Sequence, residues 1–195
     1  MPSSRRATWS IRSFLLALTF VAPSVRAGTL VERTVAFVNK RPVLLSDVEL
    51  ARALLKLDPA EAVERSIDET LMFEEASRLV NDTPTDEVVA SAILVLQEKA
   101  GPVFSAAALR RKALSQLAIS SYITQRLKPL VRVEDDEVRI VFNERVVSDP
   151  SPPVFSDVAA AIRDLLEAKI LDEKIEEWVR GLRLRADIRR PVARK

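Results

Sequence analysis

The side chains that most enzymes use for nucleophilic and acid–base catalysis are largely missing from this sequence. It has no histidine and no cysteine, and no serine lies in a Gly-x-Ser-x-Gly turn. Those groups usually supply the nucleophile and the base that activates it. The three glycines, Gly28, Gly101 and Gly181, are too far apart to form a phosphate-binding loop. The sequence therefore predicts a protein that is not an enzyme.

Acidic residues are the remaining candidates for acid–base or metal chemistry. Glu74–Glu75 and Glu176–Glu177 are adjacent pairs, and adjacent side chains on a helix point away from each other. Residues 134–137 are four acids in a row, but the alternating ligands and the glycine of a calcium loop are missing. Negative charge at a helix start explains this cluster better. We predict no catalytic, cofactor-binding or metal-binding residues.

The first 27 residues have the three parts of a secretory signal peptide. Arginines at positions 5, 6 and 12 precede an apolar run over residues 14–22, and a small-residue exit ends at Ala27. As a helix this run would rise about 14 Å, against about 30 Å for a bilayer core, so a membrane anchor is the less favoured alternative. We predict cleavage after Ala27 and a periplasmic protein without stable membrane insertion.

Removal of residues 1–27 also changes the charge. The remaining chain has 26 basic and 28 acidic side chains, a formal charge of −2, so no nucleic-acid partner is predicted. The C-terminal end is still basic, and its cationic side chains could contact a membrane surface: Arg183, Arg185, Arg189, Arg190, Arg194 and Lys195. Protection of a sheet edge is the explanation that we favour for them. Without cysteine, neither a disulfide nor a lipid-modified cysteine is possible.

Hydrophobic spacing and capping signals predict a mainly helical protein. Two short apolar runs at residues 33–39 and 42–45 predict a hairpin. Helices are expected from an N-cap at Ser46 to about Leu57, from Asp58-Pro59 to Asn81, from Thr85 to Gly101, and from Ser105 to about Lys128, where Pro129 stops the last of them.

The C-terminal part follows a proline-rich linker at residues 149–153. Apolar side chains from Val158 to Leu182 repeat every three or four residues and predict one long amphipathic helix. The pattern then alternates, with Leu184, Ala186 and Ile188 on one face of a predicted strand. A single strand is not stable alone. The predicted fold is therefore mainly α, a helical bundle with a small β-sheet formed by the N-terminal hairpin and the C-terminal strand.

Several segments resemble the SurA family of periplasmic chaperones. The resemblance includes VERTVAFVN at residues 31–39, VLLSDVE at 43–49, RSIDETLMFEEASRL at 65–79, TDEV at 85–88 and ADIR at 186–189. Each motif is modest alone, and their order gives the resemblance its specificity. It implies a helical chaperone region at residues 28–144, with residues 155–195 forming the last helix and strand of the same domain.

The sequence departs from that family in one respect. SurA-like proteins usually carry parvulin-type prolyl isomerase domains before the last long helix, and such a domain needs about a hundred residues. Here only a proline-rich linker, residues 145–154, occupies that place. The resemblance thus implies a chaperone that binds unfolded or extended polypeptides, such as outer-membrane protein precursors, without isomerase activity.

Three questions remain open at this point. Phe73, Phe104 and Tyr122 could line a client-binding surface, but core packing is the simpler explanation, and no site is assigned from them. The alternative function is a non-catalytic adaptor that docks on one envelope protein or on a separate prolyl isomerase. The sequence leaves open whether the protein forms a homo-oligomer.

Overall fold

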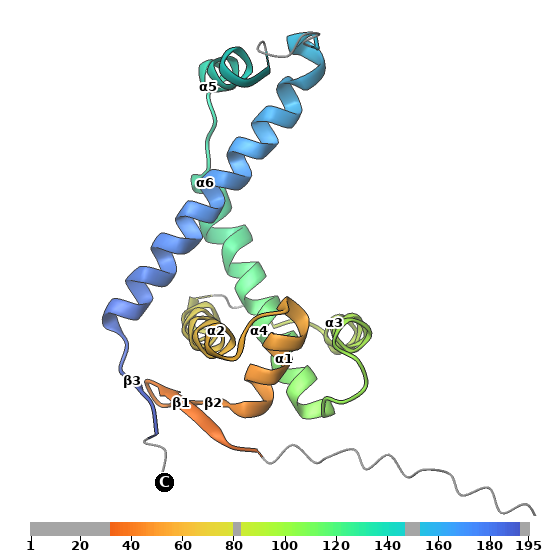
Figure 1. Cartoon of the computed structure of the whole chain (residues 1–195), viewed down its shortest axis with the longest axis vertical. Helices are drawn as coiled ribbons and strands as arrows, with labels where there is room; N and C mark the ends of the chain where they lie inside the picture. The colour runs from red at the N-terminus through yellow and green to blue at the C-terminus, as the bar shows by residue number, and fades with distance from the viewer. Residues whose placement is uncertain (1–31, 80–82, 147–152, 192–195) are drawn as a thin grey trace, which may run out of the picture.

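The computed structural model describes residues 32–79, 83–146 and 153–191. The predicted signal peptide and residues 147–152, which include most of the predicted linker, lie outside this part. The described chain is mainly helical with one small sheet, as the sequence predicts (Figure 1). Its elements are β1 (Thr34–Val38), β2 (Arg41–Leu44), α1 (Leu45–Leu55), α2 (Pro59–Leu79), α3 (Asp86–Ala100), α4 (Ala106–Tyr122), α5 (Asp135–Val141), α6 (Phe155–Arg185) and β3 (Ile188–Arg189).

The sheet joins the two ends of the described chain, which confirms the predicted closure. Its strand order is β2-β1-β3, and both pairings are antiparallel. Phe37 pairs with Arg189 and Val38 with Ile188. The β1–β2 turn reinforces this contact, because the Asn39 backbone N–H donates to the carbonyl of Asp187 at 2.8 Å. The amide of Asp187 in turn donates to the Asn39 side chain at 3.0 Å.

Most of the predicted helix starts are confirmed by their capping bonds. The Asp58 carboxylate accepts hydrogen bonds from the backbone of Ala60 and Glu61 at 2.8 and 2.9 Å. Thr85 and Ser105 cap α3 and α4 through their hydroxyl groups. The acidic cluster also lies at a helix start, where Glu134 forms a capping box with Glu137 at the beginning of α5.

Two boundaries differ from the prediction. Ser46 is not an N-cap: α1 begins one residue earlier, at Leu45, and the Ser46 hydroxyl instead donates to Glu32. The C-terminal strand is also shorter than predicted, because α6 continues to Arg185. Leu184 therefore lies in the last turn of the helix, with 83% of its surface exposed. Continued helical hydrogen bonding outweighs a short alternating pattern here.

The long fourth helix ends through two irregular turns. α4 is regular only to Tyr122, and a π-helical turn at Ile123–Leu127 and a 3₁₀ turn at Lys128–Leu130 follow. Pro129 lies within the 3₁₀ turn, where its missing N–H breaks no α-helical bond. The predicted stop near Lys128 is thus replaced by a gradual change of helix type.

Two hydrophobic clusters form the core of the body, which we define as β1–β3, α1–α4 and residues 171–185 of α6. The first cluster packs the sheet and α2 against the end of α6, with Val38, Ile67 and Leu182 among its members. The second joins α1, α3 and α4. Residues 135–146 and 155–170 form an arm that extends from the body (Figure 1), and the chain reaches the arm from α4 through the turns at residues 123–130.

Candidate functional site

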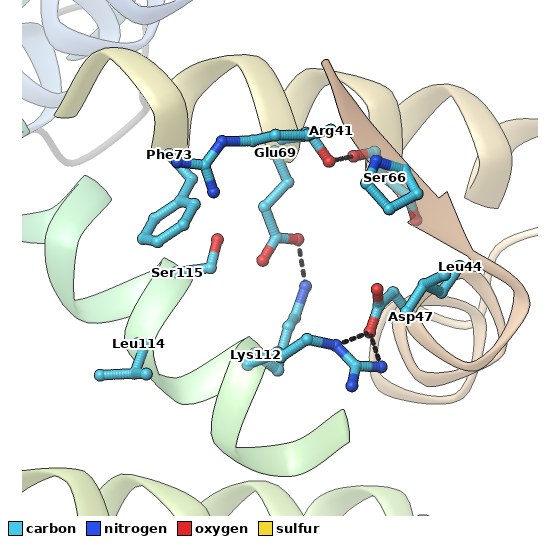
Figure 2. A pocket seen from close by; sticks show the side chains of 12 residues that line it. Arg41, Leu44, Asp47, Ser66, Glu69, Phe73, Lys112, Leu114 and Ser115 are labelled. Atoms are coloured by element: carbon cyan, nitrogen blue, oxygen red, sulfur yellow. Dashed lines mark hydrogen bonds and ion pairs between the residues drawn. The ribbon is translucent and has the colours of Figure 1, made fainter. Parts of the chain in front are cut away.

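An open cavity of about 320 Å³ lies between β2, the start of α1, α2 and α4. Its walls combine apolar groups with charged ones, as Figure 2 shows. The lining residues are Arg41, Pro42, Leu44, Asp47, Ser66, Glu69, Thr70, Phe73, Arg111, Lys112, Leu114 and Ser115. This volume is at the lower end of the range for small-molecule sites in proteins.

A buried ion pair forms one side of the cavity. Lys112 is only 8% exposed, although it is a lysine, and its Nζ pairs with the carboxylate of Glu69 on α2 (Figure 2). The packing of α4 on α2 places Lys112 between the buried residues Leu109 and Ala113 and inside the interface. A buried charge needs such a partner, because an unpaired ammonium would lose its hydration without compensation.

The Lys112–Glu69 pair also borders a second cavity of about 230 Å³. That cavity lies between the end of α1, α2 and α4, and it is lined on its apolar side by Leu54, Met72 and Ile119. Both cavities share only the two residues of the ion pair. The pair therefore separates two hollows along the α2–α4 interface.

A second charged group connects α4 with the start of α1. Arg111 donates to one carboxylate oxygen of Asp47 from Nε at 3.1 Å and from Nη2 at 2.8 Å, and to the Ser46 hydroxyl at 2.8 Å. Burial raises the pKa of Asp47, although the hydrogen bond and charge of Arg111 act in the opposite direction. The negative charges of Glu32 and Glu69 add to the increase in pKa.

Arg41 and Phe73 lie at the other side of the cavity. The guanidinium carbon of Arg41 is 5.2 Å from the centroid of the Phe73 ring, which is a cation–π distance. Within the part of the chain that the structure describes, no carboxylate forms an ion pair with Arg41. Arg41 therefore differs from Arg111 and Lys112, whose charges are already balanced by Asp47 and Glu69.

Ser115 contributes an unpaired hydroxyl group to the cavity lining. It is 8% exposed, and its Oγ has no hydrogen-bond partner among the described residues. Figure 2 shows this oxygen directed toward the space between Phe73 and Glu69. Buried hydroxyl groups in proteins are usually hydrogen-bonded, so an unpaired one calls for a physical explanation.

The outer face of α3 is a different kind of surface. Val88, Leu94 and Val95 are exposed there, Leu94 by 67%, and Val103 follows in the next loop with 77% exposure. Val88 also lines a groove of about 430 Å³ between the start of α3 and the end of α4, beside Leu117 and Ala118. We call Val88, Leu94 and Val95 the α3 surface. It offers apolar contact area on one helix.

The described residues contain no group of three or more acidic side chains placed to hold a metal ion. No helix among them is both long enough and apolar enough to cross a bilayer.

Comparison of the chain with protein-family models, with curated proteins and with solved structures finds no match. The resemblance to the SurA family therefore stays a prediction from the residues quoted above. The cavity and the exposed apolar side chains are the features from which a function can be argued.

The aromatic residues considered in the sequence have three different positions. Phe104 packs against the second core cluster. Tyr122 stacks on Trp178 of α6 with 4.3 Å between ring centroids, and burial raises the pKa of its hydroxyl. Phe73 alone of the three lines the cavity. In the adjacent acidic pair at residues 74 and 75, Glu74 accepts a hydrogen bond from Asn39, and Glu75 pairs with Arg78.

The charged and polar groups of the cavity were not predicted as a site. Lys112 gave the one signal in the sequence that could have pointed to the cavity, because it is a charged residue among apolar residues that repeat with helical spacing. Arg41, Asp47 and Ser115 carried none, because they become neighbours only when β2, α1 and α4 pack together.

Proposed function

We propose that this protein is an exported, non-catalytic chaperone that binds unfolded polypeptides in the periplasm. The observation that carries the proposal is the α3 surface, where three large aliphatic side chains lie on one helix without a covering element in the described chain. Single exposed apolar residues are common, but a grouped set that continues into a groove is typical of interaction surfaces.

The arrangement of the surface also supports a loose mode of binding. Exposed apolar residues occur on α3, in the 3₁₀ turn after α4 and on the arm, for example Leu130, Ile140 and Leu165. An extended client could touch several such places, and the client's own loss of entropy would keep the affinity low. Weak, distributed contact suits a protein that must release its clients.

The test is an aggregation assay with the purified protein and an unfolded β-barrel outer-membrane protein diluted from urea. We expect lower light scattering in the presence of the protein than with an unrelated control protein of similar size. The variant Leu94→Lys should reduce this suppression several-fold, because a charge on the α3 surface opposes apolar contact. Gln97→Lys adds the same charge at an exposed polar position of α3 and should retain the activity.

Two outcomes would count against the proposal. An equal loss of aggregation suppression in Leu94→Lys and Gln97→Lys would mean that the α3 surface is not the site that binds the client. One tight partner without any suppression of aggregation would favour the adaptor function instead.

We also expect no acceleration of prolyl isomerisation in a proline-containing test peptide, and a mature N-terminus at Gly28 by mass spectrometry.

A further inference from the structure

We propose that the cavity between β2, α2 and α4 binds a carboxylate carried on one large apolar group. Two sources share this chemistry: the C-terminal residue of a polypeptide, and a small free carboxylic acid. The inference rests on the contacts of the cavity alone, so it does not depend on whether the protein suppresses aggregation.

The size and the walls of the cavity define the apolar part of the ligand. A volume of about 320 Å³ admits one side chain or a short aliphatic chain rather than a helix or strand. Phe73 and Leu114 come from α2 and α4, while Pro42 and Leu44 come from β2. These groups give apolar contact on more than one side, which favours an aromatic or aliphatic group over a polar one.

The charged side chains that line the cavity define the polar part of the ligand. Three cations line the cavity, Arg41, Arg111 and Lys112, against two carboxylates, Asp47 and Glu69. Both carboxylates are already engaged by Arg111 and Lys112. Glu32, which lies outside the lining, is a second carboxylate partner of Arg111 at 3.9 Å, so Arg41 is the lining cation without a carboxylate partner in the described chain. A monoanion would supply that partner, and a cationic ligand would be repelled by Arg41.

Ser115 supplies a hydrogen-bond donor for the same group. Its hydroxyl is more than nine-tenths buried and has no partner in the described chain, and it points into the cavity (Figure 2). A carboxylate oxygen is a strong acceptor for such a hydroxyl. A phosphate fits less well, because it carries more charge and needs several donors, whereas one unpaired cation and one unpaired hydroxyl suit a carboxylate.

Isothermal titration calorimetry with three probes tests the proposal and distinguishes the two sources. The probes are an acetylated tripeptide that ends in phenylalanine with a free carboxylate, the same peptide with a C-terminal amide, and octanoate. We expect the free-acid peptide to bind at least about tenfold more tightly than the amide, because only the acid balances Arg41. Binding of octanoate alone would retain the carboxylate inference and assign the site to free acids.

Four variants locate the binding. Arg41→Gln should weaken binding of the acid about tenfold and leave the weak binding of the amide unchanged. Ser115→Ala should weaken it about fivefold and raise the melting temperature by about 2–4 °C, because the unpaired hydroxyl is removed. The matched controls are Arg52→Gln, on the exposed side of α1, and Ser91→Ala, whose hydroxyl bonds to a carbonyl of its own helix. Both should bind as the unmodified protein does.

Three results would overturn the proposal. The first is measurable binding of the peptide acid and the peptide amide with equal affinity. The second is no binding of either acid at about 10 mM, a concentration at which even a site with a Kd of about 1 mM would be mostly occupied. The third is unchanged binding in Arg41→Gln and Ser115→Ala variants whose circular dichroism shows that they fold.

Discussion

The body and the arm are built from similar helices but are held together differently. In the body, Ile67, Leu50 and Val38 are fully buried, and they belong to clusters that join several elements. In the described part of the arm, Val138 and Ile162 are the buried apolar residues. Helix formation alone therefore does not determine local stability, because most of the stabilisation comes from the apolar area that each helix buries.

The contacts of the arm are mainly at its surface. Phe142 and Phe155 meet edge to face with 5.2 Å between centroids, and Arg139 lies 4.9 Å above the Phe155 ring. An ion pair between Arg163 and the exposed Asp135 adds a further link between α5 and α6. Exposed pairs of this kind contribute little free energy. We therefore expect the arm to open more readily than the body.

The largest effect is expected in the body. Ile67→Ala removes a side chain that is fully buried between the sheet and α2, and it should lower the free energy of unfolding by about 3 kcal/mol. Urea denaturation followed by circular dichroism measures this change. Ile140→Ala, at a half-exposed position of the arm, is the matched control and should change it little. A similar loss in both variants would contradict the comparison.

A smaller and more local effect is expected in the arm. Val138→Ala deletes two methyl groups from the most buried residue of α5, so local opening should become easier by about 2 kcal/mol. Amide hydrogen exchange of α5 should then be about thirtyfold faster, while exchange in α2 should not change. Faster exchange in both helices would show that arm and body unfold as one unit.

A substitution at the junction between α6 and α2 should change the free energy of unfolding less. Arg183 donates to Glu64 at 3.0 Å and also pairs with Asp68, and the Asp68 hydrogen bond is the main cause of a raised Arg183 pKa. Arg183→Gln should cost about 1 kcal/mol in urea denaturation, a modest value because solvent screens a partly exposed pair. Arg180→Gln, one turn earlier on an exposed position, should cost less. An equal loss in the free energy of unfolding in both variants would mean that the contacts of Arg183 do not stabilise this junction.

The smallest effect concerns pH and the cavity. Since the pKa of Asp47 is raised in the folded protein, the folded state holds this proton more tightly than the unfolded state. Its contribution to stability is therefore present at low pH and lost as the pH rises through the raised pKa. When the pH is raised from about 3 to about 6, the free energy of unfolding of the unmodified protein should fall relative to that of Asp47→Asn. Urea denaturation of both proteins at both pH values measures this difference. A rise in the free energy of unfolding relative to Asp47→Asn over this pH range would contradict a raised pKa of Asp47.

Local chemistry explains why many elements could be predicted. Asp58, Thr85 and Ser105 cap helices with atoms of their own segment, so the signal does not depend on distant parts of the chain. Ser46 has the same chemistry but a competing partner, Glu32, which lies 14 residues away. Leu184 failed as a strand residue for a related reason, because helix continuation competed with a pattern of only a few residues.

The sequence by itself determined the helical class, most helix starts and the closure of the sheet, because these follow from periodicity, caps and the need of a single strand for a partner. Only the tertiary structure decided the cavity. Ser115 lies far from Arg41 and Asp47 in the chain, and their relation depends on how α4 packs against α2 and β2. Side-chain packing between helices sets such distances, and no local pattern in the sequence encodes them.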